Sequence, residues 1–430
     1  MTQPENTWER LKKILVIAVP AALALVTQGA INQVDFYFVG QIGGALDPTP
    51  LAAVIGWDAT PAIDGASFVQ EQVRASQAAM GISMKVLWLF AGALASLAIG
   101  TQAMVARRFG ESDEASVGAV AINSVAASVA ASGLFTVIGL LSLEPLFHYI
   151  SSAAPGVVEA GVQFSEIRLF ALLGIVWTAS HRAFFDGLGK TWIFMVIAVL
   201  MNTINVVLDY AMVFGTWGIP RFGPNGAAWA SFVSAFVGLA LLVMWTNWGS
   251  FRRFKMWNLK RISPTLMWRI CTFSLPNAVA TAGMTAGFLL FDKVIAELDK
   301  IRVEEALVGV VGAENFAGMS EVVRETTMSL HHIPADLYQS TSQLIIVVMM
   351  LFFMVGFGFG LAAATLVSQS LGAGDPEGAS RNGWMTIWVG GGIVAVFGMG
   401  LVFFPESIAA VFNPGDPLVQ ETAAGPLRGV

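Results

Sequence analysis

The sequence has little charge and almost no cysteine. Only 12% of its 430 residues are Asp, Glu, Lys or Arg, about half the share that is typical of soluble domains. Its single cysteine, Cys271, has no partner within the chain for a disulfide. Basic residues are not in excess, because 23 Lys and Arg stand against 29 Asp and Glu, for a net charge of −6. These shortages exclude a disulfide-stabilised secreted domain and the basic surface needed to bind nucleic acid.

Long apolar runs are abundant instead. Hydrophobic residues make up 56% of the chain, and its mean hydropathy is +0.69. A bilayer core needs about 20 apolar helical residues, and only helices satisfy their own backbone in lipid without closing a barrel. We therefore predict an all-α integral membrane protein with about nine spans, at 14–40, 86–106, 118–143, 168–187, 192–214, 226–247, 270–296, 346–367 and 384–404.

The positions of Lys and Arg predict the orientation. Most of them fall on the side of the N-terminus, which predicts a cytoplasmic N-terminus. Two long segments, 41–85 and 297–345, would then be outward loops. They could simply cover the mouth of a cavity, or they could act as a gate or partner-docking element, since loops of this length are often functional.

An internal repeat spans the chain. Residues 105–113 recur as 367–375, an offset of 262. Smaller matches pair Pro20 and Asp35 with Pro276 and Asp292, and Pro145 and Arg168 with Pro405 and Arg428. Such an offset predicts two homologous six-helix lobes of the same orientation, at 1–250 and 251–430. The second lobe holds only three predicted spans, so three helices are expected to be missing, through either fragmentation or natural truncation.

Two polar stripes lie inside the predicted spans. Ionisable groups there are costly unless paired, so they are candidates for function. Each stripe is spaced to occupy one helix face, and each ends in an aspartate five residues before its span ends. The stripes consist of Gln28, Asn32 and Asp35 in the first span and of Asn202, Asn205 and Asp209 in the fifth.

Ser231, in the sixth span, could reach the same depth. Two carboxylates, carboxamides and a hydroxyl provide hard oxygen ligands for a proton or small cation, and close carboxylates in a low dielectric cannot both ionise cheaply. The alternative is that each polar group merely bonds to a neighbouring helix. Pro20, 15 residues before Asp35, is either a hinge or a static kink. No metal site is predicted, because His331 and His332 lack a Cys or third His nearby.

Several segments together resemble the multidrug and toxic compound extrusion (MATE) family of antiporters. They are 20–40, 105–110, 182–189, 205–209 and 226–231. The resemblance implies twelve helices in two six-helix lobes in the bacterial inner membrane. It also implies efflux of amphipathic or organic-cation xenobiotics in exchange for H⁺ or Na⁺, by a monomer without a cofactor. It places the ion site on Asp35, Asn205, Asp209 and Ser231, in the N-terminal lobe, and a bending proline at Pro20.

Two other functions stay open from the residues alone. A lipid-linked oligosaccharide flippase could share the duplicated bundle, but it would need cationic side chains inside its spans, where Lys and Arg are nearly absent. A non-transporting membrane scaffold could bind a partner through the two long outward segments. An enzyme is not expected, since no span interior pairs a nucleophile with a base.

Overall fold

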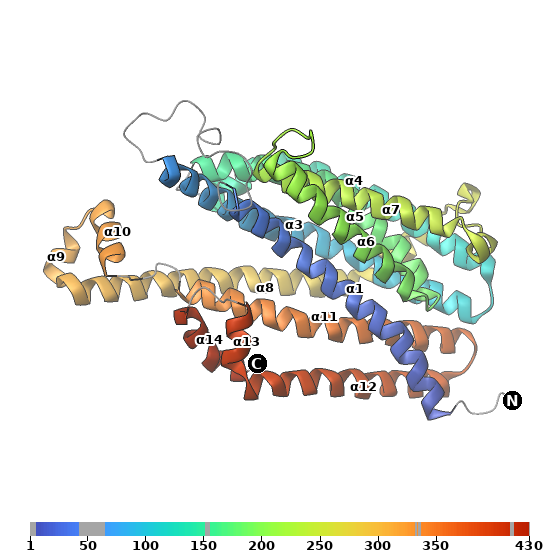
Figure 1. Cartoon of the computed structure of the whole chain (residues 1–430). Helices are drawn as coiled ribbons and strands as arrows, with labels where there is room; N and C mark the ends of the chain where they lie inside the picture. The colour runs from blue at the N-terminus through green and yellow to red at the C-terminus, as the bar shows by residue number, and fades with distance from the viewer. Residues whose placement is uncertain are drawn as a thin grey trace. The chain divides into compact units, whose positions relative to one another are not determined.

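The computed structural model describes residues 6–42, 65–150, 155–331, 333, 337–412 and 417–429. No strand occurs among them. Figure 1 shows the helices in chain order. They are α1 (Thr7–Gly40), α3 (Gly65–Gly110), α4 (Glu114–Ile150), α5 (Pro155–Gly187), α6 (Thr191–Phe214), α7 (Pro224–Thr246), η1 (Gly249–Phe254), η2 (Leu259–Arg261), α8 (Pro264–Val311), α9 (Ala313–Ala317), α10 (Glu321–Leu330), α11 (Leu337–Gly372), α12 (Pro376–Phe403), α13 (Pro405–Phe412) and α14 (Pro417–Gly429).

Eight helices in the described part of the chain are long and apolar enough to cross a membrane. They are α1, α4, α5, α6, α7, α8, α11 and α12. The remaining predicted span, 86–106, lies within the 46-residue helix α3. The bounds of α6 and α7 agree with the predicted spans to within two residues. The prediction of an all-α membrane protein is confirmed.

The two segments predicted as outward loops contain a large share of helix. In the first segment, α3 begins at Gly65, and residues 43–64 lie outside the described residues. In the second, α8 continues to Val311 and is followed by α9, α10 and the start of α11. Hydropathy detects apolar composition rather than helix, so a polar helix such as α10 gives no signal in a search for apolar spans.

The chain divides into two compact units. The first comprises 1–282 and 357–388, and the second comprises 283–356 and 389–430. Within the first unit, α5 packs along α3, α4 and α7, while α6 packs between α1 and α7. This division records packing and not duplication, so the lobe boundary near residue 250 stays a prediction.

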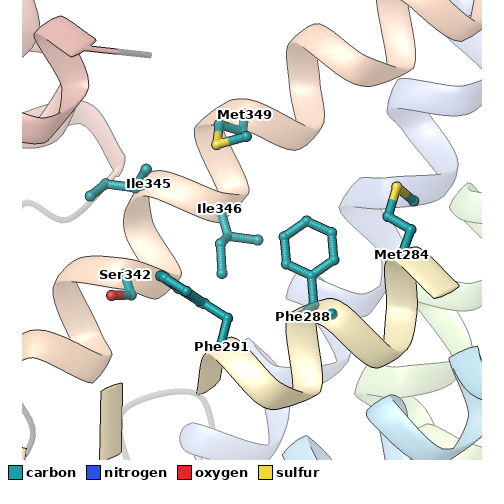
Figure 2. Close-up of a pocket in the computed structure, with 8 residues that line it drawn as sticks. Met284, Phe288, Phe291, Ser342, Ile345, Ile346 and Met349 are labelled. Carbon is teal, nitrogen blue, oxygen red and sulfur yellow. The ribbon is translucent and has the colours of Figure 1, made fainter. Parts of the chain in front are cut away.

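The second unit contains an apolar cavity of about 380 Å³ between α8 and α11. Figure 2 shows Phe288 and Phe291 of α8 facing Ile346 of α11, with Met284 and Met349 farther along the two helices. Gly287, Ser342 and Ile345 complete the lining. Two large rings and two flexible thioethers can adapt to flat apolar ligands of different shapes.

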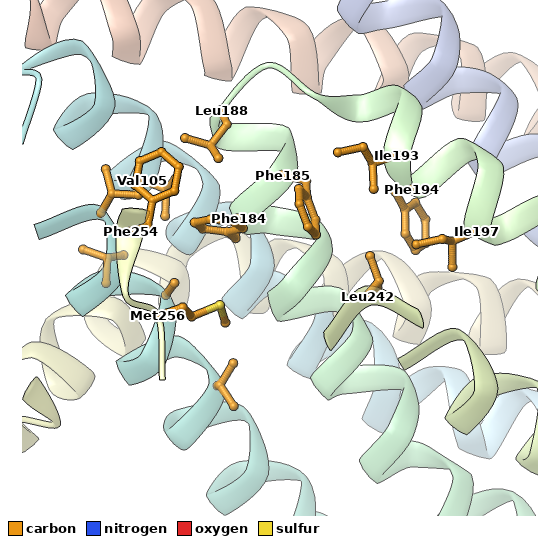
Figure 3. Close-up of a cluster of buried hydrophobic side chains, with 14 of the residues drawn as sticks. Val105, Phe184, Phe185, Leu188, Ile193, Phe194, Ile197, Leu242, Phe254 and Met256 are labelled. Carbon is orange, nitrogen blue, oxygen red and sulfur yellow. The ribbon is translucent and has the colours of Figure 1, made fainter. Parts of the chain in front are cut away.

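The core of the first unit gathers where α5 ends and α6 begins (Figure 3). Phe184 and Phe185 are fully buried. Phe184 meets Phe254 of η1 edge to face at 5.6 Å, and Phe185 meets Phe251 at 5.2 Å. Each edge-to-face pair contributes about 0.5–1.5 kcal/mol beyond its burial. This cluster fixes the turn from α5 to α6, two helices that carry functional candidates described below.

The sequence repeat is visible in the helix bounds. Helix α3 ends at Gly110 and α11 ends at Gly372, 262 residues later; α4 and α12 begin at Glu114 and Pro376, with the same offset. Asp113 and Asp375 cap these two helices in the same way, since Asp113 Oδ1 accepts from Ser116 N at 3.0 Å and Asp375 Oδ1 accepts from Gly378 N at 2.8 Å.

The two repeat segments also contact each other reciprocally. A Cβ added at Gly110 would collide with the carbonyl oxygen of Gln369, and one added at Gly372 would collide with the carbonyl oxygen of Arg107. Gln369 lies 262 residues after Arg107, so these two residues are counterparts in the repeat, as Gly110 and Gly372 are. Gly110 contacts Gln369, and Gly372 contacts Arg107. A symmetric interface has this pattern, and glycine is what allows two backbones to approach so closely.

Candidate functional site

Four polar side chains from three helices meet in the first unit. Asp35 of α1, Asn205 and Asp209 of α6, and Ser231 of α7 are buried, with exposures of 0%, 0%, 0% and 9%. The four-residue step between Asn205 and Asp209 places both on one face of α6. The structure therefore brings together the four residues predicted from the sequence as an ion site.

Hydrogen bonds connect these four residues. Ser231 Oγ donates to Asp35 Oδ2 at 3.1 Å. In the amide orientation that satisfies both of its partners, Asn205 donates to Asp209 Oδ2 at 3.1 Å and accepts from the Ser231 backbone N–H at 3.2 Å. The amide is thus a bridge between α6 and α7, and the hydroxyl is a bridge between α7 and α1.

The two aspartates lie in one buried network, because Ser231 donates to Asp35 while Asn205 joins Asp209 to the Ser231 backbone. Two carboxylates in one buried network cannot both ionise cheaply. Among the described residues, Asp209 Oδ1 is buried and receives no N–H or O–H donor. A buried acceptor without a donor costs about 1–3 kcal/mol, which favours the form in which the pair holds one proton.

A fifth residue, Arg168 of α5, belongs to this network and was missed from the sequence. Its Nη1 lies 3.3 Å from Asp35 Oδ2, and the side chains of Arg168 and Asp35 are 6% and 0% exposed. Arg168 Nη2 contacts the Met84 sulfur at 3.0 Å. The available signal was the position of this arginine at the first residue of a predicted span, where a charge is costly.

Asn202, a further residue of the polar stripes, bonds outside this network. Asn202 donates to the backbone carbonyl of Thr27 at 2.6 Å and so joins α6 to α1. In the part of the chain that the structure describes, no hydrogen bond joins Gln28 to the four site residues, and the side chain of Asn32 lies outside the described residues. Pro20 lies inside α1, which continues without a break from Thr7 to Gly40.

The described residues contain no cluster of three or more His, Cys, Asp or Glu side chains that could hold a metal ion. His332 and Asp336 lie outside the described residues. What the network can do chemically follows from its own groups, because two buried carboxyls in one network can bind one proton.

Known proteins resemble the chain in sequence. The family model named MatE matches residues 73–211 and 338–425, together more than half of the chain. A relative from Thermotoga maritima, named "Probable multidrug resistance protein NorM", is 27% identical over 81% of this chain and 67% of its own length.

Solved structures resemble the chain in fold. A MOP superfamily transporter from Pyrococcus furiosus aligns with a TM-score of 0.69 at 18% identity, covering 97% of this chain and 78% of that one. A structure described as the outward-facing conformation of a multidrug resistance MATE family transporter aligns with a TM-score of 0.66 at 18% identity and the same coverage. At these identities the likeness establishes the fold. The family model settles the family: the chain belongs to the MatE family.

Proposed function

We propose that this protein is a secondary transporter that expels amphipathic or cationic xenobiotics in antiport with H⁺ or Na⁺. The observation that carries the proposal is the buried pair of Asp35 and Asp209, which Asn205 and Ser231 join in one hydrogen-bonded network. The names of relatives as multidrug resistance proteins support the substrate class. The flippase and scaffold alternatives are not favoured by these relatives.

In this proposal, the carboxyl pair takes up a coupling ion when it faces one side of the membrane and releases it on the other. Binding of the ion changes the charge of the pair and with it the ion pair between Asp35 and Arg168. Because Asp35 lies on α1 and Asp209 on α6, and α1 packs on α6, a change at the pair alters how α1 is held.

The apolar cavity of the second unit is the surface that we propose for the substrate. Its rings Phe288 and Phe291 and its thioethers Met284 and Met349 suit an amphipathic ligand of variable shape. Its two rings can also interact with a cationic headgroup through their faces.

We further propose that the protein is a monomer in a bacterial inner membrane and that its N-terminus is cytoplasmic. Support for the orientation comes from the excess of Lys and Arg on the N-terminal side of the spans. The transport cycle needs no cofactor beyond the coupling ion.

The test is efflux of a fluorescent organic cation from cells or proteoliposomes that contain Asp209→Asn. The substitution keeps the size of the side chain and removes its proton-binding carboxyl, so gradient-driven efflux should fall to the level of empty vesicles. A matched control is Asp299→Asn, which alters a buried aspartate of the second unit that pairs with Arg302. Efflux that survives in Asp209→Asn at equal expression would remove this aspartate from the mechanism.

A further inference from the structure

The guanidinium of Arg168 places a fixed positive charge directly beside Asp35. Arg168 Nη1 and Ser231 Oγ both contact the same oxygen, Asp35 Oδ2, at 3.3 and 3.1 Å. The Asn205 amide donates a hydrogen bond to Asp209 Oδ2 at 3.1 Å. Two of the four carboxyl oxygens in the site are therefore already engaged by protein donors.

The formal charges around the pair can be counted element by element. Asp35 from α1 and Asp209 from α6 bring two potential negative charges, and Arg168 from α5 brings one positive charge that is never lost. Helix α7 contributes the neutral Ser231, and α3 contributes the Met84 sulfur. The cluster of described groups thus has a net charge of −1 without a proton and is neutral with one proton.

A proton and a metal ion place different demands on this site. A proton needs only one available carboxyl oxygen, and Asp209 Oδ1 is buried with no donor among the described residues. A sodium ion needs several oxygen ligands in a shell around it, as hard cations do, and two carboxyl oxygens already accept from protein donors. It would also sit beside a fixed guanidinium charge in a medium that screens poorly.

We propose that Arg168 acts as a built-in cation that reserves the Asp35–Asp209 site for a single proton and excludes sodium. The inference deepens the proposed function and rests on it for the identity of the site. If Arg168 served only to hold α5 to α1 through its ion pair with Asp35, its substitution would change the stability of the protein and not its ion selectivity. A measurement of ion selectivity therefore distinguishes the two roles.

The experiment compares the full-length wild type with Arg168→Gln, which removes the charge and retains donor groups, and with Arg168→Lys, which retains the charge. Sodium binding is measured in detergent as the shift in apparent melting temperature between NaCl and choline chloride at equal ionic strength. Transport is measured in proteoliposomes as efflux of a fluorescent cation driven by a pH gradient or by a sodium gradient.

The wild type and Arg168→Lys should show no sodium-specific shift and no sodium-driven efflux. Arg168→Gln should gain a sodium-specific stabilisation, and its sodium-driven efflux should rise roughly tenfold above background, the factor for one decade in affinity. Addition of Asp209→Asn to Arg168→Gln should abolish the gained shift, which would assign it to this site.

Two outcomes would overturn the inference. One is a sodium response in the wild type, which decides the matter even if Arg168→Gln does not fold. The other is a folded Arg168→Gln that stays indifferent to sodium. If no gradient drives efflux in any variant, while sodium stabilises Arg168→Gln alone, the proposed antiport fails and the assignment of Arg168 stands.

Discussion

Arg168 and Asp35 are 133 residues apart in the sequence, yet they form a buried ion pair with a separation of 3.3 Å between Nη1 and Oδ2. The pair joins α5 to α1. Because the attraction depends on a negative charge at Asp35, a proton that moves onto Asp35 weakens the bond between the two helices. Proton binding is thereby linked to how firmly α1 is attached.

Removal of one partner of this pair should cost more than removal of both. Asp35→Asn leaves the Arg168 charge buried without its carboxylate, and breaking a buried pair in this way costs about 3–5 kcal/mol. We expect a marked fall in the apparent melting temperature, partly restored in the double variant Asp35→Asn/Arg168→Gln. A thermal double-mutant cycle measures the coupling; strictly additive shifts would contradict the pairing.

The variant Pro20→Ala should show whether Pro20 acts as a hinge during transport or only as a static kink in α1. Pro20 lies between the two points at which α6 holds the α1 backbone, since Thr191 donates to the Ile17 carbonyl at 2.8 Å and Asn202 to the Thr27 carbonyl at 2.6 Å. Alanine restores a backbone donor and stiffens the helix. We expect unchanged or higher thermal stability with reduced efflux. Full efflux in a stable variant would identify a static kink.

Gly372→Ala should destabilise the protein through backbone crowding. The new Cβ would overlap the Arg107 carbonyl oxygen, which belongs to the backbone of α3 and cannot rotate away. Overpacking of this kind costs about 1–3 kcal/mol. The control is Gly391→Ala, because a Cβ there has no neighbour within 4 Å among the described atoms. Size-exclusion profiles and thermal unfolding in detergent compare the two; equal behaviour would refute the close approach.

Asp113 predicts a small pH dependence at the start of α4. Hydrogen bonds from the Ser116 side chain and backbone N–H lower the pKa of Asp113 below its ordinary value of 3.8. A lowered folded-state pKa contributes stability that is complete at neutral pH and is lost as the pH falls through that pKa. Asp113→Asn keeps a cap but does not titrate. The difference in melting temperature between the two proteins should therefore shrink on acidification, and a difference independent of pH would argue against the cap.

Ile346→Trp should fill the cavity between α8 and α11 and restrict bulky substrates. Ile346 lies opposite Phe288 and Phe291 in Figure 2, so an indole there would take up space that a ligand needs. We expect efflux of large dyes to fall more than efflux of small cations, as measured by substrate competition. Val396→Trp, on a side chain that is 63% exposed, is the control. If both substitutions reduced efflux equally, the cavity would not determine which substrates are transported.

The sequence predicted the helices that carry the candidate site well, because the site lies within apolar runs whose polar interruptions stand out. The bounds of α6 and α7 and the convergence of Asp35, Asn205, Asp209 and Ser231 follow from helical spacing and matched depth. Arg168 could not be assigned, because a charge at the edge of an apolar run is compatible with a loop until its partner is known.

The sequence pattern also could not predict where a helix continues beyond the end of its apolar run. Residues 65–85 and 297–311 are helical without the continuous hydrophobicity that marks a span. Their backbone bonds are local, and their composition resembles that of loops. The two-unit division depends on packing between helices distant in sequence, which no local pattern records.

The matched contacts of Gly110 with Gln369 and of Gly372 with Arg107 are what an ancestral dimer of two identical chains would show. Two copies of a half-length polypeptide, each ending a helix with the same glycine, would meet through this surface as a two-fold homodimer. Fusion of the two genes would keep the interface while freeing each copy to diverge. Arg107 and Gln369 match in position in the repeat and differ in charge, as this origin would allow.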